Sequence, residues 1–81
     1  MAIEYKKNLA VFSDVVSVED AEALLEWLQK KSAAHVDLSA CTHLHPANLQ
    51  VLMAAKPAIS AWPIDIGLAA WLKSALSVPQ L

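Results

Sequence analysis

The sequence of 81 residues contains no arginine, a single glycine and a single cysteine. Six lysines supply its basic side chains, with adjacent pairs only at Lys6-Lys7 and Lys30-Lys31, and the formal net charge is −2. Binding of nucleic acid normally requires a clustered basic face that displaces counterions from phosphates. Because no such cluster is visible in the sequence, nucleic acid is excluded from the expected partners.

The single cysteine bears on disulfide formation and on the cellular compartment. Cys41 has no second cysteine with which to form a disulfide within the chain, and this usage suits a reducing compartment. The first seven residues lack the apolar segment of a signal peptide, and no run approaches the ~20 apolar residues that span a bilayer. The sequence therefore predicts a cytoplasmic protein without membrane insertion. With only Gly67 available, turns must use Asn, Asp, Ser and Pro.

Apolar residues, in contrast, are abundant. They make up 57% of the chain and include three tryptophans, against an average of about 45–50%. Chains of about 60 residues bury only about 60% of their unfolded surface, so a chain of this length leaves part of its apolar content exposed. Contiguous exposed apolar surface usually marks a partner site. We therefore expect residues 1–81 to form a single domain that acts as a binding module rather than an enzyme.

Hydrophobic periodicity predicts an alternation of strands and helices. The expected elements are a bent strand or hairpin within residues 3–12, a helix over residues 18–31 that begins after Ser17, a strand over residues 34–39, a helix from Pro46 to the residues before Pro57, a short strand over residues 59–62 and a last helix capped by Asp65. Such an order is typical of an α/β layer in which helices cover a sheet.

Residues 37–53 are the most distinctive segment. They are interpreted as a strand end, a tight polar turn and the start of an amphipathic helix, in which Leu49, Leu52 and Met53 form the inner stripe. Asp37 is expected to bond loop amides, and Ser39 to form the turn. Both residues are therefore assigned a loop-structuring role.

The segment from Asp37 to Leu52 resembles the signature of the STAS family, the sulfate-transporter and anti-sigma-factor-antagonist domain. In that family Asp-Leu-Ser is followed by four residues, then Ile-Asp-Ser-Ala-Gly-Leu and a leucine-rich helix. Here His45 and Pro46 occupy the Asp-Ser positions, and Asn48 replaces the glycine. The resemblance implies a STAS-like α/β fold with a mixed sheet of about four strands and three helices, shortened at its C-terminal end.

The resemblance also implies a non-enzymatic protein-protein interaction module in bacterial signalling or regulation. In the family a partner kinase phosphorylates the serine of the turn. Pro46 has no hydroxyl, so phosphorylation cannot switch the protein at that position. The implied partners are a kinase, an anti-sigma factor, a chemoreceptor component or the ATPase of a lipid-transport ABC complex, and the sequence does not choose among them. The residues expected to bind the partner are Thr42, His43, His45, Pro46, Asn48, Leu49 and Gln50.

An alternative reading is a small metal- or ligand-binding protein that uses His35, Cys41, His43 and His45. Imidazole and thiolate are ligands that zinc prefers. The spacing, however, matches no established zinc pattern, and no metal site or cofactor is predicted. A Cys-His nucleophile is weaker still, because no glycine-rich oxyanion loop accompanies Cys41. No catalytic residue is assigned.

The tryptophans suggest a further possibility. Trp71 is expected in the core, with Leu68, Leu72 and Ala75 on the same face of the last helix, whereas Trp27 lies at the margin of the apolar stripe of its helix. Exposed tryptophan is common in binding hot spots. Homodimerisation through the first or the last helix is therefore a second hypothesis, and it would add stability to a small chain.

Overall fold

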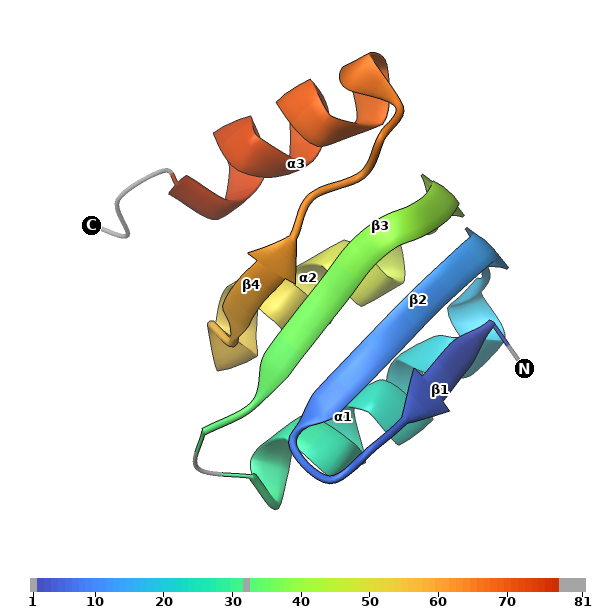
Figure 1. Ribbon diagram of the computed structural model, residues 1–81. Coiled ribbons are helices and arrows are strands. Elements are labelled where there is room, and N and C mark those ends of the chain that lie inside the picture. Colours follow the sequence, from blue (N-terminus) through green and yellow to red (C-terminus); the bar gives the residue numbers. More distant parts are fainter. Residues whose placement is uncertain (1, 32, 78–81) are drawn as a thin grey trace.

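A computed structural model of the chain describes residues 2–31 and 33–77 (Figure 1). The elements in chain order are β1 (Ile3–Tyr5), β2 (Leu9–Val16), a 3-10 turn η1 (Val18–Asp20), α1 (Ala21–Gln29), β3 (His35–Leu44), α2 (Pro46–Ala55), β4 (Ala58–Ala61) and α3 (Ile66–Ser77). The strands form one sheet in the order β1-β2-β3-β4, in which β1 is antiparallel to β2 and the other neighbours are parallel. The predicted α/β class, with a four-stranded mixed sheet and three helices, is confirmed.

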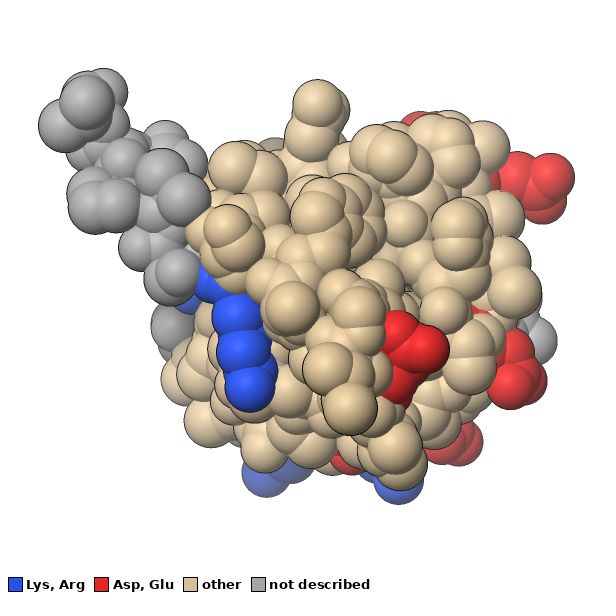
Figure 2. Space-filling view, turned by 90° about the horizontal axis from the view of Figure 1, so that it is seen from above, with Lys and Arg blue, Asp and Glu red and all other residues tan. Residues whose placement is uncertain are grey.

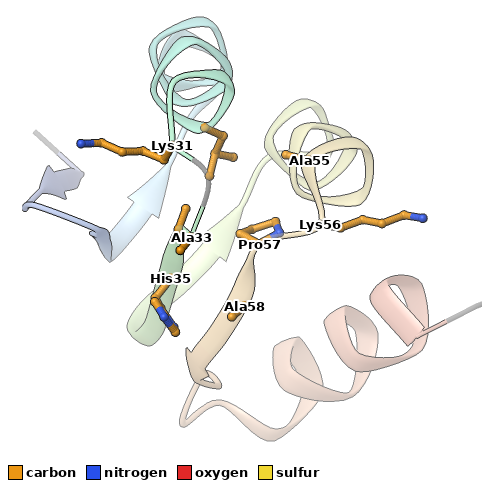
Figure 3. Close-up of a pocket in the computed structure, with 9 residues that line it drawn as sticks. Lys31, Ala33, His35, Ala55, Lys56, Pro57 and Ala58 are labelled. Atoms are coloured by element: carbon orange, nitrogen blue, oxygen red, sulfur yellow. The ribbon is translucent and has the colours of Figure 1, made fainter.

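Two helices cover one face of this sheet. Figures 1 and 3 show α1 and α2 side by side on that face, while α3 lies on the β4 side of the molecule and contacts α2. The core lies between the sheet and the helices, where Phe12 and Leu38 of the strands and Leu24 and Leu52 of the helices have no exposed surface. Leu72 of α3 joins the same core.

Of the two alternatives predicted for residues 3–12, a bent strand or a hairpin, the structure has the hairpin. The alternation of apolar residues breaks at Lys7-Asn8, and there the chain turns between β1 and β2. The amide of Lys6 donates to the carbonyl oxygen of Leu9 at 2.7 Å, which closes the turn. Ile3, opposite Phe12 in the antiparallel ladder, is buried with it.

Strand β3 is longer than its periodicity predicts, and the polar turn expected after residue 39 is wrong. The chain stays extended to Leu44, so His45 alone separates β3 from α2. The register against β2 shifts twice, once between Val11 and Ser13 and once between Asp14 and Val15. At each shift β3 carries one extra residue, which is the definition of a β-bulge. The bulges turn Cys41 and Leu44 back toward the core after strict alternation has ended.

The first two helices begin and end close to the residues that the capping and proline signals of the sequence predict. The helix predicted over residues 18–31 is present as η1 followed by α1, and the amide of Ser17 donates to the Asp20 carboxylate at 3.2 Å. Helix α2 begins at Pro46 as predicted. It ends through Lys56, whose φ of 53° is left-handed, one residue before Pro57.

The C-terminal elements are also close to those predicted. Strand β4 is shifted by one residue from the expected range, and Asp65 caps α3 by accepting from the amide of Leu68 at 2.8 Å. The core placement of Trp71 is wrong, because 42% of that residue is exposed. Trp27 is half-buried, as expected, and its ring centroid lies 5.3 Å from that of Tyr5.

Candidate functional site

Apart from α3 and the residues just before it, the most accessible apolar surface lies where the parallel strands end. Strands β2 and β3 both end at this edge, and η1 and α2 both begin there (Figure 1). In open α/β sheets, ligands and partners bind preferentially at the carboxyl ends of the strands. We define the carboxyl-end surface by its exposed residues Val15, Val18, Thr42, His43 and Pro46.

Acidic residues border this surface. Asp14 and Glu19, next to Val15 and Val18 in the chain, are both exposed. Figure 2, which views the molecule from above, shows mostly uncharged side chains with several acidic groups among them. Val15 is 57% exposed and Val18 is 53% exposed, although both are β-branched apolar residues that strands and cores normally bury. Exposed apolar side chains bordered by charged ones favour contact with another protein surface, since interfaces commonly have an apolar centre and a polar rim.

The start of α2 is held firmly against the end of β2. The amide of His45 donates to the carbonyl oxygen of Val16 at 2.9 Å, which continues the ladder between β2 and β3 by one residue. His45 Nδ1 then accepts from the amide of Ala47 at 3.0 Å and so caps the helix. Pro46 follows at the first helical position, where its missing amide hydrogen costs nothing. Pro46 itself is exposed, so the cap presents a rigid, uncharged corner.

Asn48 does not lie on the surface, and its predicted contact with a partner is wrong. The residue is completely buried, and its Nδ2 donates to the carbonyl oxygen of Ser17 at 2.7 Å. Its Oδ1 is buried without a hydrogen-bond partner among the described residues. Asn48 therefore joins the first turn of α2 to the start of η1, and it is a structural residue.

The predicted contact of Leu49 with a partner is also wrong. Only 7% of it is exposed, because it belongs to the core between α2 and the sheet. Thr42, His43, Pro46 and Gln50 remain exposed, and His45 is half-buried. The structure thus brings four of the seven predicted residues to the surface. It adds Val15 and Val18, which lie far from residues 42–50 in the sequence and carry no motif.

Asp37 bonds an amide as predicted, but within a strand rather than a loop. Its Oδ1 accepts from the amide of Ser39 at 2.9 Å and from the Ser39 hydroxyl at 2.7 Å. Both bonds lie at the first bulge of β3, where an extra residue interrupts the ladder. The bond from the Ser39 amide, with a smaller effect of its hydroxyl, holds the pKa of Asp37 below its usual value of 3.8. The pair stabilises the bulge.

The four residues of the metal-binding alternative are not assembled as a site. His35 begins β3, whereas His43 and His45 lie at its other end. Cys41 is buried and its Sγ lies 3.5 Å from the carbonyl oxygen of His43, to which it donates. Burial raises the pKa of this thiol, which opposes formation of the thiolate. Within residues 2–31 and 33–77, no three His, Cys, Asp or Glu side chains gather where they could hold a metal ion.

A shallow hollow of about 280 Å³ opens at the opposite end of the sheet, where α1 and α2 finish and β3 and β4 begin. Figure 3 shows its close-up, with Lys31 and Lys56 extending away from it on opposite sides and Ala33 and Ala58 at its wall. Binding sites for small molecules have a few polar groups that point toward one position. The residues that line this hollow do not provide such a group. The hollow is therefore not the candidate site.

The comparisons leave the family open. No family model matches the chain, and no curated protein matches it. In the part of the chain that the structure describes, no helix has the length and apolar character needed to cross a membrane.

Proposed function

We propose that the protein is a non-enzymatic protein-protein interaction module of the STAS type, which binds its partner through the carboxyl-end surface. The observation that carries the proposal is the exposure of Val15 and Val18 beside Thr42, His43 and Pro46 at the end of the sheet where β2 and β3 finish. An exposed apolar patch with acidic residues at its border fits a protein partner.

The order of the elements supports this proposal. The resemblance of residues 37–52 implies a mixed sheet of about four strands with three helices, and the chain has this architecture. The helix of this segment begins at Pro46. In such a module the corner at the start of this helix faces the partner, and here residue 46 has no hydroxyl. Binding is therefore constitutive at this corner, and it is not switched by phosphorylation of that residue.

The proposed setting is bacterial signalling or regulation in the cytoplasm. The partner classes are a kinase, an anti-sigma factor, a chemoreceptor component and a transporter ATPase, each of which presents a protein surface. Burial of the valines against an apolar patch on the partner would supply about 25 cal/mol per Å² of apolar area removed from water. No cofactor takes part in this contact.

The test is affinity capture from the native host with a tagged chain and two sets of variants. Val18→Glu combined with His43→Glu places two charges on the carboxyl-end surface, where both residues are exposed. Ala54→Glu, at an exposed position of α2 away from this end, is the matched control. Thermal unfolding of each variant checks that the fold is retained.

We expect mass spectrometry to find one of the named partner classes with the unmodified chain and with Ala54→Glu, and to find at least about tenfold less with the double variant. A tenfold loss corresponds to about 1.4 kcal/mol, less than the usual cost of placing one uncompensated charge in a buried interface. Equal capture by the folded double variant would show that the partner binds elsewhere.

A further inference from the structure

The outer side of α3 is apolar in a way that the fold alone does not explain. Its inward residues pack against the molecule, with Leu72 completely buried. Yet Ile66 is 85% exposed, Trp71 is 42% exposed, and Ile64 just before the helix is 84% exposed. We define the α3 face as the exposed residues Ile64, Ile66, Gly67, Ala70, Trp71 and Ser74. Figure 1 places α3 on the outside of the molecule, on the β4 side.

The α3 face is mostly apolar, and the exposed Asp65 lies between Ile64 and Ile66 at its start. Lys73 is the only charged residue within Ile66–Ser77, and its Nζ lies 5.6 Å from the ring centroid of Trp62 in the same molecule. Anionic membranes and nucleic acids are recognised through clusters of Lys and Arg. A highly charged protein surface would lose its hydration here and meet few opposite charges. The best match for a mostly apolar face is another mostly apolar face, and a second copy of the chain always presents one.

The residue pattern of α3 is complementary to itself. Ile66, Ala70 and Ser74 recur every four residues and so form one row along the helix. If two such helices cross in antiparallel fashion with Ala70 at the centre, Ile66 of one copy lies opposite Ser74 of the other. A large side chain then faces a small one at both ends of the row. A two-fold interface requires this reciprocal fit.

Small residues also make a close approach possible. Gly67 is exposed, and a Cβ added to it would meet only the Asp65 carboxylate, at 3.4 Å. The space beside Gly67 and Ala70 can therefore receive a side chain from the other copy. Trp71, next to this row, is the type of residue that carries much of the energy of an interface when it becomes fully buried.

The size of the face limits the area that two copies can bury between them. A stable complex buries about 800 Å² on each partner, which is about a sixth of the surface of 5040 Å². Helix α3, with 12 residues, is about 18 Å long, and the molecule measures 33 × 30 × 21 Å. One helix and the residues before it offer a smaller contact than this, so we expect a weak dimer that forms at high protein concentration.

We propose that the α3 face binds the same face of a second copy, with the two α3 helices antiparallel and Ala70 close to the two-fold axis. This inference goes beyond the proposed function, because it uses a surface other than the carboxyl-end surface. It leaves Val15, Val18 and Pro46 free in each copy. The dimer would present two partner-binding ends.

Sedimentation velocity over a range of about 1–200 μM tests the proposal. We expect a monomer–dimer equilibrium for the unmodified chain and, for Ile66→Glu, a dissociation constant raised on the order of 100-fold, because two carboxylates are buried per dimer. Val18→Glu, which changes the carboxyl-end surface, should leave the dimer intact and so distinguishes failure of this inference from failure of the proposed function. A chain that is monomeric at the top of this range, or an Ile66→Glu variant that dimerises with an unchanged dissociation constant, would refute the α3 dimer.

Disulfide trapping tests the geometry. Helices packed about 8–10 Å apart, each with Cα atoms about 2.3 Å from its axis, bring facing Cα atoms to roughly 4–5 Å, within the range for a disulfide. In a Cys41→Ala background, Ala70→Cys should therefore form a covalent dimer under mild oxidation, whereas Ala54→Cys on α2 should not. Equal crosslinking of the two variants would overturn the proposed axis.

Two further outcomes identify a different occupant. Co-sedimentation of the chain with vesicles of neutral or anionic phospholipid, lost in Ile66→Glu, would assign the face to a lipid surface and reject the dimer. Sedimentation of the chain as a monomer, together with capture of a different protein that Ile66→Glu loses, would assign the face to that protein. Either result replaces the second copy as the occupant.

Discussion

The side-chain Nδ2 of Asn48 donates to the backbone carbonyl oxygen of Ser17 at 2.7 Å, across 31 residues of sequence. This bond joins the first turn of α2 to the residue before η1. Beside it, the amide of His45 donates to the carbonyl oxygen of Val16. The start of α2 is therefore held against the segment that joins β2 to η1. The carboxyl-end surface consists of residues from these segments and from the end of β3.

Asn48→Ala is expected to destabilise the fold by about 1–3 kcal/mol, because the bond to the Ser17 carbonyl oxygen is lost and a completely buried side chain is shortened. Asn48→Arg should destabilise it more, since a fully buried position does not accommodate a long charged side chain. The measurement is the free energy of unfolding from urea titration. Gln50→Ala, two residues further on and exposed, is the control and should change stability by less than about 0.5 kcal/mol.

If Asn48→Ala proved as stable as the unmodified chain, the Asn48 side chain would contribute nothing to the free energy of unfolding. The gain from removing the buried, unpartnered Oδ1 would then equal the loss of the bond to Ser17. Asn48→Asp separates these contributions. It keeps the shape of the side chain but sets a second oxygen against the Ser17 carbonyl. It should therefore be the least stable of the small substitutions at neutral pH.

The sequence predicts much of this fold because most of its local signals agree with the packing. Proline at the first position of α2 and aspartate before α3 mark the two helix starts correctly. The end of β3 cannot be found in this way. Strand prediction relies on strict alternation, and the buried residues Leu38, Cys41 and Leu44 are three apart because bulges interrupt the ladder.

The candidate site is less predictable than the fold, for a related reason. A polar residue in the first turn of a helix is usually solvated, so the sequence favours a surface position for Asn48. Its burial depends on the Ser17 carbonyl, whose position is a matter of tertiary structure. Val15 and Val18 escape prediction because isolated valines carry no functional signal in a sequence. Their exposure follows only from the place where β2 ends.

Asp37 should make the stability of the protein depend on pH in the acidic range. Hydrogen bonds from Ser39 hold the pKa of Asp37 below 3.8 in the folded state. The stabilisation that this carboxylate supplies is therefore fully present above the unfolded pKa, and it is lost as the pH falls through the lowered folded pKa. In Asp37→Asn, the side-chain oxygen still accepts from Ser39 but does not titrate.

The measurement is the free energy of unfolding between about pH 2 and pH 6 for both chains. We expect the advantage of the unmodified chain over Asp37→Asn to be constant above about pH 5 and to shrink below about pH 4. Parallel curves over the whole range would mean that the bond between Asp37 and Ser39 does not favour the charged form.

The histidine cap of α2 gives a second test of local structure. His45→Ala removes the acceptor of the Ala47 amide and should cost about 1 kcal/mol. His45→Asp restores an acceptor and adds a negative charge at the helix N-terminus, where the dipole favours it by about 0.3–1 kcal/mol. Urea titration should therefore rank His45→Asp above His45→Ala. The opposite ranking would show that the imidazole acts by packing rather than as a cap.

Cys41 should react slowly with thiol reagents, although it is the only thiol of the chain. Only 2% of it is exposed, and burial raises the pKa of the thiol above its usual value of 9.0. Labelling then requires local opening of β3. An opening free energy of about 3 kcal/mol would slow the reaction about 100-fold relative to an exposed thiol.

The comparison for this last prediction is the rate of modification by a disulfide reagent at about pH 8, close to the pKa of an unperturbed thiol. The unmodified chain is measured beside Ala33→Cys in a Cys41→Ala background, because Ala33 is exposed. Urea below the unfolding transition should speed labelling of Cys41 and leave labelling of the Ala33→Cys variant unchanged, since only the buried thiol depends on opening. Equally fast reaction of the two chains in buffer would contradict the burial of Cys41 in the core.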